Sequence, residues 1–328
     1  MFIRSGFIRL TLFLLVFVAS AAQAANYSNI YIFGDSLSDN GNLKAITQNP
    51  AIPERFTNGP VAVEVLGASL GFSVTPSLHL LPPEVVNGQY GNNYAIAGAI
   101  AIDADGDETT PDTNLPTQVN AFLQLHGGQA PADALYVVMI GGNDIYDAQD
   151  IVIDGTWGAG IEADQRLKAA TDSVKRQLGK LVASGAQHIL VVNAPDIGAT
   201  PLTDIKKAQV LAGADSLRDL FVGQTLVPYT RTLSQIYNLR LAISVAEVEL
   251  ASGVDIKEAN LLAFLDDSIA NRDEYGYENV TDACIFLQTQ GGAPNPGCNF
   301  STWLFFDEIH PTAVTHQRAA QTLLEALQ

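Results

Sequence analysis

Basic residues are scarce in this 328-residue sequence, which has 17 lysines and arginines against 35 aspartates and glutamates. The formal net charge is −18 at pH 7. A protein this acidic is repelled by the phosphates of nucleic acids and gains no attraction to anionic lipids. We therefore expect no nucleic acid partner. Solubility alone is a sufficient reason for the charge.

Cysteine is also rare, and the two present are Cys284 and Cys298. Neither has a neighbouring histidine or further cysteine, so a metal site is a poor interpretation of the pair. Two cysteines 14 positions apart in an exported chain favour one disulfide that closes a small loop. In the chain-entropy model such a bridge contributes about 3 kcal/mol to stability.

Long apolar runs are missing after the first 24 residues, and no unit of 20–50 residues repeats. The start of the chain has Arg4 and Arg9, a short apolar run, and small residues with Ala22 and Ala24 in the A-x-A pattern. This is the layout of a cleaved secretory signal, and the run is shorter than the roughly 20 apolar residues of a spanning helix. We expect residues 1–24 to be a signal peptide and the protein to be secreted or periplasmic.

The rest of the chain, residues 25–328, is expected to be one large α/β domain, because its composition is ordinary and no linker divides it. Short apolar runs predict buried strands, and segments with helical spacing lie between them. The expected strands are 29–33, 134–140, 188–192 and 239–245. The expected helices are 116–125, 163–183, 208–237 and 313–327. This alternation predicts a three-layer α/β/α sandwich with a central parallel sheet.

Polar residues directly follow three of the expected strands. Ser36 follows the first, Asn143 the second, and a polar turn at 193–196 the third. Ligands of parallel sheets bind outside the carboxyl ends of the strands. The sequence therefore predicts an active site at this edge.

Ser36 and His310 are the candidate nucleophile and base. A serine hydroxyl becomes a good nucleophile only when a base removes its proton, and taken alone Ser36 could equally cap a helix. Of the five histidines, only His310 has an acidic residue at a useful spacing, which is Asp307. A hydrogen bond from the imidazole to Asp307 would fix the tautomer, although His310 alone could be a surface histidine beside a helix start.

An acyl-transfer site also needs hydrogen-bond donors for the negative oxygen that develops in the transition state. Asn143 offers a side-chain amide, and Gly98 offers a backbone N–H that can approach a substrate closely. Each stretch by itself could be only a turn. The G-x-S-x-G nucleophile motif of other hydrolases is absent.

Four segments together resemble the conserved blocks of the GDSL (SGNH) hydrolase family, in family order. They are FGDSLSDNGN at 33–42, GNNYAIAGA at 91–99, GND at 142–144 and DEIH at 307–310. The resemblance implies a flavodoxin-like SGNH hydrolase fold over residues 25–328. It also implies Ser36 as nucleophile, His310 as base and Asp307 as the residue that orients it. The oxyanion donors would be the Ser36 N–H, Gly98 and Asn143, although Ala97 stands where many members have glycine.

The long first block resembles the branch with secreted bacterial lipases, phospholipases and the passenger domains of esterase autotransporters. We expect a secreted ester hydrolase of the phospholipase A or lysophospholipase type, without a cofactor or metal. A short-chain esterase for soluble esters, such as choline esters or acetylated sugars, and an acyltransferase to a sterol stay open as alternatives. A binding protein with a dead site is the alternative from another class.

Further expectations concern partners. We expect a monomer with a small-molecule or lipid ester as substrate, and residues 78–81 could form either a transient membrane contact or core. The chain as given has no room for a barrel domain after the last expected helix, so we expect the form without one. The acidic residues 103–108 do not match a calcium loop and are expected to be solvated.

Overall fold

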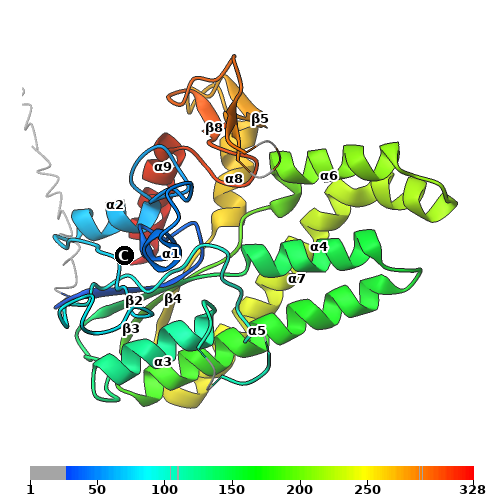
Figure 1. Ribbon diagram of the computed structural model, residues 1–328. Coiled ribbons are helices and arrows are strands. Elements are labelled where there is room, and N and C mark those ends of the chain that lie inside the picture. Colours follow the sequence, from blue (N-terminus) through cyan, green and yellow to red (C-terminus); the bar gives the residue numbers. More distant parts are fainter. Residues whose placement is uncertain (1–26, 104, 109–110, 288, 290) are drawn as a thin grey trace, which may run out of the picture.

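The computed structural model describes residues 27–328 except 104, 109–110, 288 and 290. The expected signal peptide, 1–24, lies outside the described residues. A central parallel sheet has helices on both faces (Figure 1). The predicted α/β class with a central parallel sheet is therefore confirmed.

Four strands form the sheet in the order β1-β2-β3-β4, and all neighbours are parallel. They are β1 (Ile30–Gly34), β2 (Leu135–Met139), β3 (His188–Val192) and β4 (Ile256–Ala259). Every residue of β1 and β2 is buried, as expected for strands that are covered on both faces. The three strands that the apolar runs near 29–33, 134–140 and 188–192 predicted are present.

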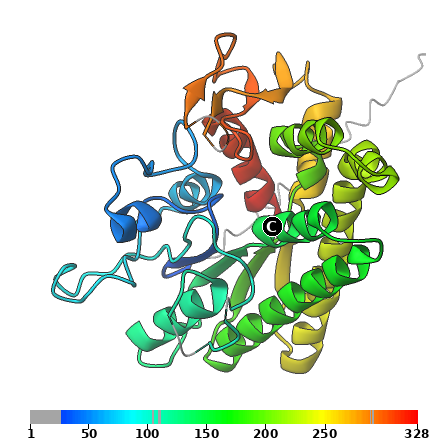
Figure 2. The ribbon, with the colours of Figure 1, turned by 45° about the vertical axis from the view of Figure 1, so that its right-hand side comes forward.

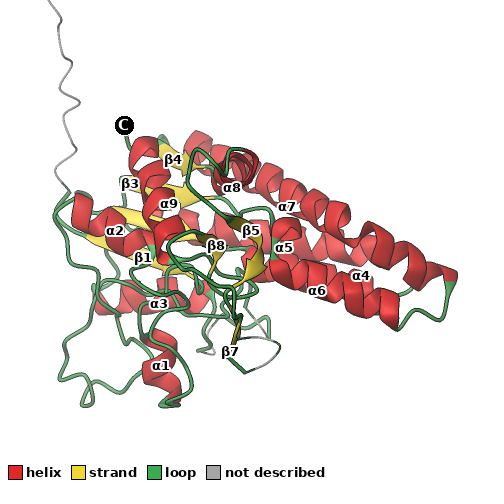
Figure 3. Cartoon of the chain, turned by 90° about the horizontal axis from the view of Figure 1, so that it is seen from above, coloured by secondary structure: helices red, strands yellow, loops and turns green. Residues whose placement is uncertain are grey.

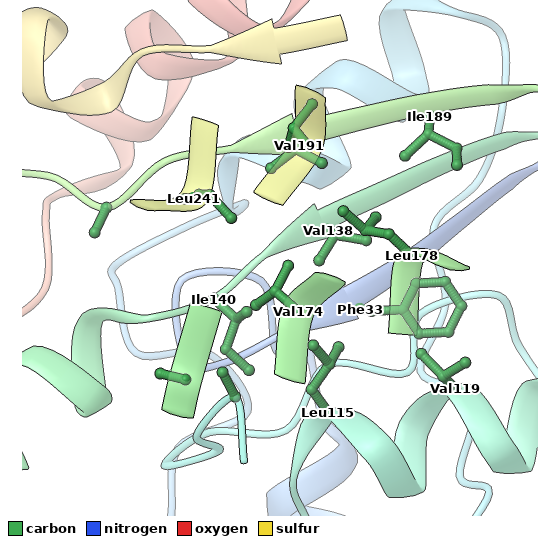
Figure 4. Close-up of a cluster of buried hydrophobic side chains, with 14 of the residues drawn as sticks. Phe33, Leu115, Val119, Val138, Ile140, Val174, Leu178, Ile189, Val191 and Leu241 are labelled. Carbon is green, nitrogen blue, oxygen red and sulfur yellow. The ribbon is translucent and has the colours of Figure 1, made fainter. Parts of the chain in front are cut away.

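Alternate side chains of β1 enter two separate cores. Ile30 and Ile32 pack under α2 (Ala62–Ser69) and α9 (Ala313–Ala326). Tyr31 and Phe33 pack on the other face, beneath helices that Figure 2 shows opposite α2 and α9. These helices are α3 (Leu115–Leu125), α5 (Ala159–Ala183) and α7 (Leu217–Ser252). Figure 4 shows this second core, in which Val174 and Leu178 of α5 meet Val138 of β2.

The fourth strand differs from its prediction. Residues 239–245 lie inside α7 because their apolar residues continue a helical stripe that includes Tyr237, Leu241 and Val245. The actual strand is β4, an edge strand in which only Ile256 and Ala259 are buried. Its central residues are charged, so its sequence lacks the apolar run that marks the other strands.

The helix predicted over 208–237 is two helices. α6 (Pro201–Ala212) ends at Gly213, and α7 begins after Ser216, whose hydroxyl accepts a hydrogen bond from the Asp219 N–H at 3.1 Å. The remaining helices are α1 (Asn42–Thr47), α4 (Gly142–Asp154), α8 (Leu261–Ala270) and a short 3₁₀ turn, η1 (Ile197–Ala199). Figure 3 shows α4, α5, α6 and α7 extending together away from the sheet.

The C-terminal part adds two small strand pairs beside α9. β5 (Asn279–Ala283) pairs with β8 (Trp303–Phe305), and β6 (Ile285–Phe286) with β7 (Ala293–Pro294). Cys284 and Cys298 form the expected disulfide, with their Cα atoms 4.9 Å apart. The bridge fastens the segment that precedes β8, and β8 leads into the loop that carries His310.

Within the acidic segment 103–108, Asp103 binds the backbone of its own loop, whereas Glu108 forms an ion pair with Lys180 of α5 at 2.6 Å and is therefore not simply solvated as expected. The Asp103 carboxylate accepts hydrogen bonds from the N–H groups of Asp105 and Asp107 at 3.1 and 3.0 Å. Across the described residues no group of three or more histidines, cysteines and acidic residues is placed to hold a metal ion. The same residues include no helix that is both long and apolar enough to cross a membrane.

The carboxyl ends of the four strands are in register, with Gly34, Met139, Val192 and Ala259 in one row. The loops that follow them therefore start at the same edge. Gly34 allows β1 to lie this close to β2, because a Cβ at this position would be 2.2 Å from the Met139 carbonyl oxygen. Only glycine fits without pushing the two strands apart.

We expect Gly34→Ala to lower the free energy of unfolding by about 3 kcal/mol, since an added methyl group must displace main-chain atoms of β2. Gly179→Ala is the matched control. Gly179 lies in α5, where an added Cβ meets nothing within 4 Å, so alanine should raise the free energy by about 1 kcal/mol. Urea unfolding curves measure both effects, and equal stability of the two variants would contradict this explanation.

Candidate active site

Ser36 lies on a tight turn directly after β1. The Asp35 carbonyl accepts hydrogen bonds from the N–H groups of Ser38 and Asp39, and the Asp35 carboxylate accepts one from the Leu37 N–H at 3.0 Å. These bonds leave Ser36 at the apex of the turn. The interpretation of Ser36 as a helix cap fails, because the first helix, α1, begins only at Asn42.

His310 lies on the loop between β8 and α9 and is 3% exposed. Its Nε2 atom is 2.7 Å from Ser36 Oγ, and its Nδ1 atom is 2.8 Å from both oxygens of the Asp307 carboxylate. The Asp307 carboxylate also accepts hydrogen bonds from the N–H groups of Ile309 and His310, at 2.8 and 2.7 Å. The structure thus joins Ser36, His310 and Asp307 in one chain of hydrogen bonds.

The partners of His310 fix its tautomer. An ionised carboxylate can only accept hydrogen bonds, so His310 Nδ1 carries the proton that faces Asp307. The Nε2 atom is then unprotonated and accepts the hydroxyl hydrogen of Ser36. This is the arrangement that allows the imidazole to remove the serine proton.

Two of the three oxyanion candidates, Gly98 and Asn143, lie on neighbouring segments. The Asn143 side chain, in the first turn of α4, donates a hydrogen bond to the Ala99 carbonyl at 2.8 Å. Ala99 directly follows Gly98, which is exposed and has a φ of +83°, a backbone conformation that favours glycine. Asn143 and Ser36 line one cavity, whereas Gly98 is outside its lining.

Asp39, which the sequence did not single out, connects the Ser36 turn to the Gly98 loop. Its buried carboxylate accepts hydrogen bonds from the N–H groups of Gly41 and Asn42 on one side and of Ala97 on the other, each at 2.8 Å. Burial raises the pKa of Asp39, and these N–H groups act in the opposite direction. The sequence did hold one signal for Asp39, since it lies in the first family block, three residues after Ser36.

Asp35 and Asp144 are two further buried carboxyl groups near the site. Burial raises the pKa of Asp35 to about 7, while the Leu37 N–H and the charge of His310 act against the rise. Burial also raises the pKa of Asp144, and the Arg166 guanidinium, 2.8 Å away, opposes that effect. Both residues adjoin predicted site residues in the sequence, but their burial could not be predicted from it.

An apolar cavity of about 70 Å³ opens beside Ser36. Its lining includes Tyr146 of α4, Leu261 and Phe264 of α8, and Ile309. α8 was not predicted, so this wall of the site was missed. Since a water-sized group needs about 10–15 Å³ of such space, the cavity has room for about five of them.

The other four histidines lie outside this chain of hydrogen bonds. His316 of α9 is buried, and its Nδ1 atom accepts a hydrogen bond from the Ala62 N–H at 3.2 Å. His126 bonds to Tyr31 and Phe122, His79 bonds to Ser77, and His188 begins β3. The selection of His310 by its spacing from Asp307 therefore agrees with the geometry.

Comparison with known proteins identifies the family. The family described as GDSL-like Lipase/Acylhydrolase matches residues 30–323. Lipase 1 of Photorhabdus luminescens is 24% identical over 94% of this chain, and Esterase EstA of Pseudomonas aeruginosa is 28% identical over 93%. The chain spans 52% and 48% of the length of these two relatives.

A GDSL esterase/lipase of Arabidopsis thaliana is 25% identical over 90% of this chain and 86% of its own length. Among solved structures, an extracellular lipase of Streptomyces rimosus aligns over 92% of the chain and 100% of its own, with 15% identity and a TM-score of 0.41. The family match alone covers most of the sequence. This chain belongs to the GDSL-like lipase/acylhydrolase family, whose members are carboxylic ester hydrolases.

Proposed function

We propose that this protein is an exported serine ester hydrolase that uses Ser36 as nucleophile, His310 as general base and Asp307 to orient His310. The observation that carries the proposal is the chain of hydrogen bonds from Ser36 Oγ through His310 to Asp307, at the carboxyl edge of a parallel sheet. A binding protein would have no need for this alignment of three buried groups.

The geometry supports a two-step mechanism. His310 Nε2 removes the hydroxyl proton as Ser36 Oγ attacks the ester carbonyl, and Asp307 stabilises the imidazolium that forms. The Ser36 N–H and the Asn143 amide, whose residues line the same cavity, stabilise the oxyanion, and the Gly98 N–H is the third donor that the family resemblance implies. The alcohol leaves with the proton from His310. Water, activated by the same imidazole, then attacks the acyl-enzyme, releases the acid and restores Ser36.

The lining of the cavity supports an ester with an apolar acyl group as substrate. Leu261, Phe264 and Ile309 offer such a group an apolar environment, which favours a lipid ester of the phospholipase A or lysophospholipase type. The volume of about 70 Å³ favours the second candidate, a short-chain esterase, because it is small beside the roughly 300–1,000 Å³ of a typical ligand pocket. A longer chain would have to displace the cavity walls or continue along the surface.

Two features support export. The first 24 residues have the layout of a cleaved secretory signal. The disulfide between Cys284 and Cys298 suits an oxidising compartment.

Hydrolysis of 4-nitrophenyl esters from acetyl to palmitoyl, together with lysophosphatidylcholine, tests the function. We expect the wild type to cleave these esters and Ser36→Ala to lose at least about 10³-fold in kcat, because the nucleophile is gone. Ser38→Ala is the matched control, since Ser38 is a buried serine two residues away whose hydroxyl has no hydrogen-bond partner.

The chain-length profile decides between the two substrate classes. A maximum at the short acyl esters identifies the short-chain esterase, and efficient cleavage of palmitoyl esters and lysophosphatidylcholine identifies the lipid hydrolase. A folded wild-type protein that cleaves none of them would contradict the proposal.

The pH dependence of kcat/KM tests the base. We expect kcat/KM to rise between pH 5 and pH 8, because only the neutral imidazole of His310 can accept the Ser36 proton. Asp35, whose pKa is raised by burial to about 7, ionises in the same range. Asp35→Asn removes this second ionisable group. If His310 causes the rise, the rise should persist in this variant. A flat profile in the wild type would exclude His310 as base, and loss of the rise in Asp35→Asn alone would assign it to Asp35.

A further inference from the structure

Two neighbouring helix turns on the far side of α4 and α6 expose a cluster of large apolar side chains. We call this cluster the apolar tip. It consists of Trp157 and Ile161 around the α4–α5 turn and Leu217, Leu220 and Phe221 at the start of α7. Figures 1 and 3 show that these helices project away from the sheet, so the tip is at the end of a protrusion.

The exposure of the tip is high for residues of this kind. Trp157 and Ile161 are each 69% exposed, Leu217 is 84% exposed and Phe221 is 55% exposed. Exposed apolar residues that occur singly need no explanation, but a contiguous group marks an interaction surface. By contrast, Trp303, the second tryptophan of the chain, is buried beside the disulfide loop.

The tip is a defined surface because contacts hold the two turns together. The rings of Trp157 and Phe221 lie 6.0 Å apart. The Arg218 guanidinium donates hydrogen bonds to the carbonyl oxygens of Val152 and Ile153, at the end of α4. The side chains therefore form one surface rather than two separate loop ends.

The charges around the tip restrict what it can bind. Asp154, Glu162, Asp215 and Asp219 adjoin it, and Arg218 is the one basic residue in the segments 152–162 and 213–222. The Arg218 side chain is only 13% exposed and pairs with Asp219. Anionic lipids and nucleic acids would be repelled, whereas a surface of uncharged or zwitterionic headgroups would not.

The position of the tip relative to the site supports a role in substrate delivery. α4 begins at Gly142–Asn143 and α6 follows η1, so both helices start at the active-site edge. With 13 and 12 residues, they carry the tip about 20 Å from that edge. A lipid surface that contacts the tip would thus lie about one helix length from the edge of the sheet that carries the site.

We propose that the apolar tip docks the enzyme on a lipid surface with zwitterionic headgroups. The inference rests on the proposed function, since an ester hydrolase for lipid substrates needs access to the surface that holds them. Trp157 suits the headgroup region, because its ring joins an apolar surface to a polar N–H, and Phe221 offers a purely apolar ring for the layer beneath. Residues 78–81, the loop considered from the sequence, are only partly exposed and offer no comparable apolar surface.

Tryptophan fluorescence offers a direct test, because only Trp157 is exposed. The Ser36→Ala variant is titrated with phosphatidylcholine vesicles, so that hydrolysis does not interfere. We expect the emission to shift to shorter wavelength as Trp157 leaves water. Trp157→Phe keeps an apolar ring. This variant should still sediment with the vesicles, but the shift in emission should disappear.

Phe221→Ser keeps the Trp157 reporter and removes one apolar side chain. We expect it to weaken vesicle binding about tenfold, the effect of losing one buried aromatic ring. Leu250→Ser is the matched control, because Leu250 is 90% exposed at the opposite end of α7 and should not change binding. Cleavage of a soluble 4-nitrophenyl acetate should be equal in the wild type, Phe221→Ser and Leu250→Ser.

Absence of vesicle binding, tighter binding to phosphatidylglycerol vesicles, or equal loss in Phe221→Ser and Leu250→Ser would overturn the docking inference. So would a dimer in sedimentation equilibrium that Phe221→Ser dissociates, which would assign the tip to a second copy of the chain. These results would leave the hydrolase proposal intact. If the protein binds vesicles but cleaves no ester, the docking observation stands and the hydrolase proposal is contradicted.

Discussion

The hydrogen bond between His310 Nε2 and Ser36 Oγ joins residues that are 274 positions apart, and the site depends on holding both partners still. Ser36 is fixed by β1, whose end is locked against β2 at Gly34. His310 is fixed by β8 and α9, since Thr312 donates a hydrogen bond to the Trp303 carbonyl and α9 packs against α2. The sheet and the C-terminal helix therefore act as one rigid support.

Buried carboxylates connect the loops of this support at a cost in desolvation. Asp39 binds N–H groups of two loops, and Asp144 binds the Ala101 N–H and the Arg166 guanidinium. Glu308 follows Asp307 in the sequence and is fully buried. It accepts hydrogen bonds from the N–H and the hydroxyl of Thr289, which lies in the loop that the disulfide closes. Each of these buried carboxyl groups would lose its hydrogen-bond partners if its loop moved, so it opposes displacement of the loop that carries it.

The sequence predicted the parts of the fold with strong local patterns. Three buried strands, the terminal helix and the four family blocks were found from apolar runs and motifs, and Ser36, His310 and Asp307 meet as their order suggested. β4 was missed because an edge strand with Lys257 and Glu258 at its centre has no apolar run. The cavity wall from α8, the burial of Asp35 and the apolar tip depend on tertiary packing, which no local pattern encodes.

The most direct test of the account is covalent labelling with a fluorophosphonate, followed by mass spectrometry to locate the adduct. The reagent reacts only with an activated serine. We expect one adduct, on Ser36, and labelling at least about a hundredfold slower in a folded His310→Gln variant. An adduct on another serine, or equally fast labelling without His310, would contradict the claim that this histidine activates Ser36.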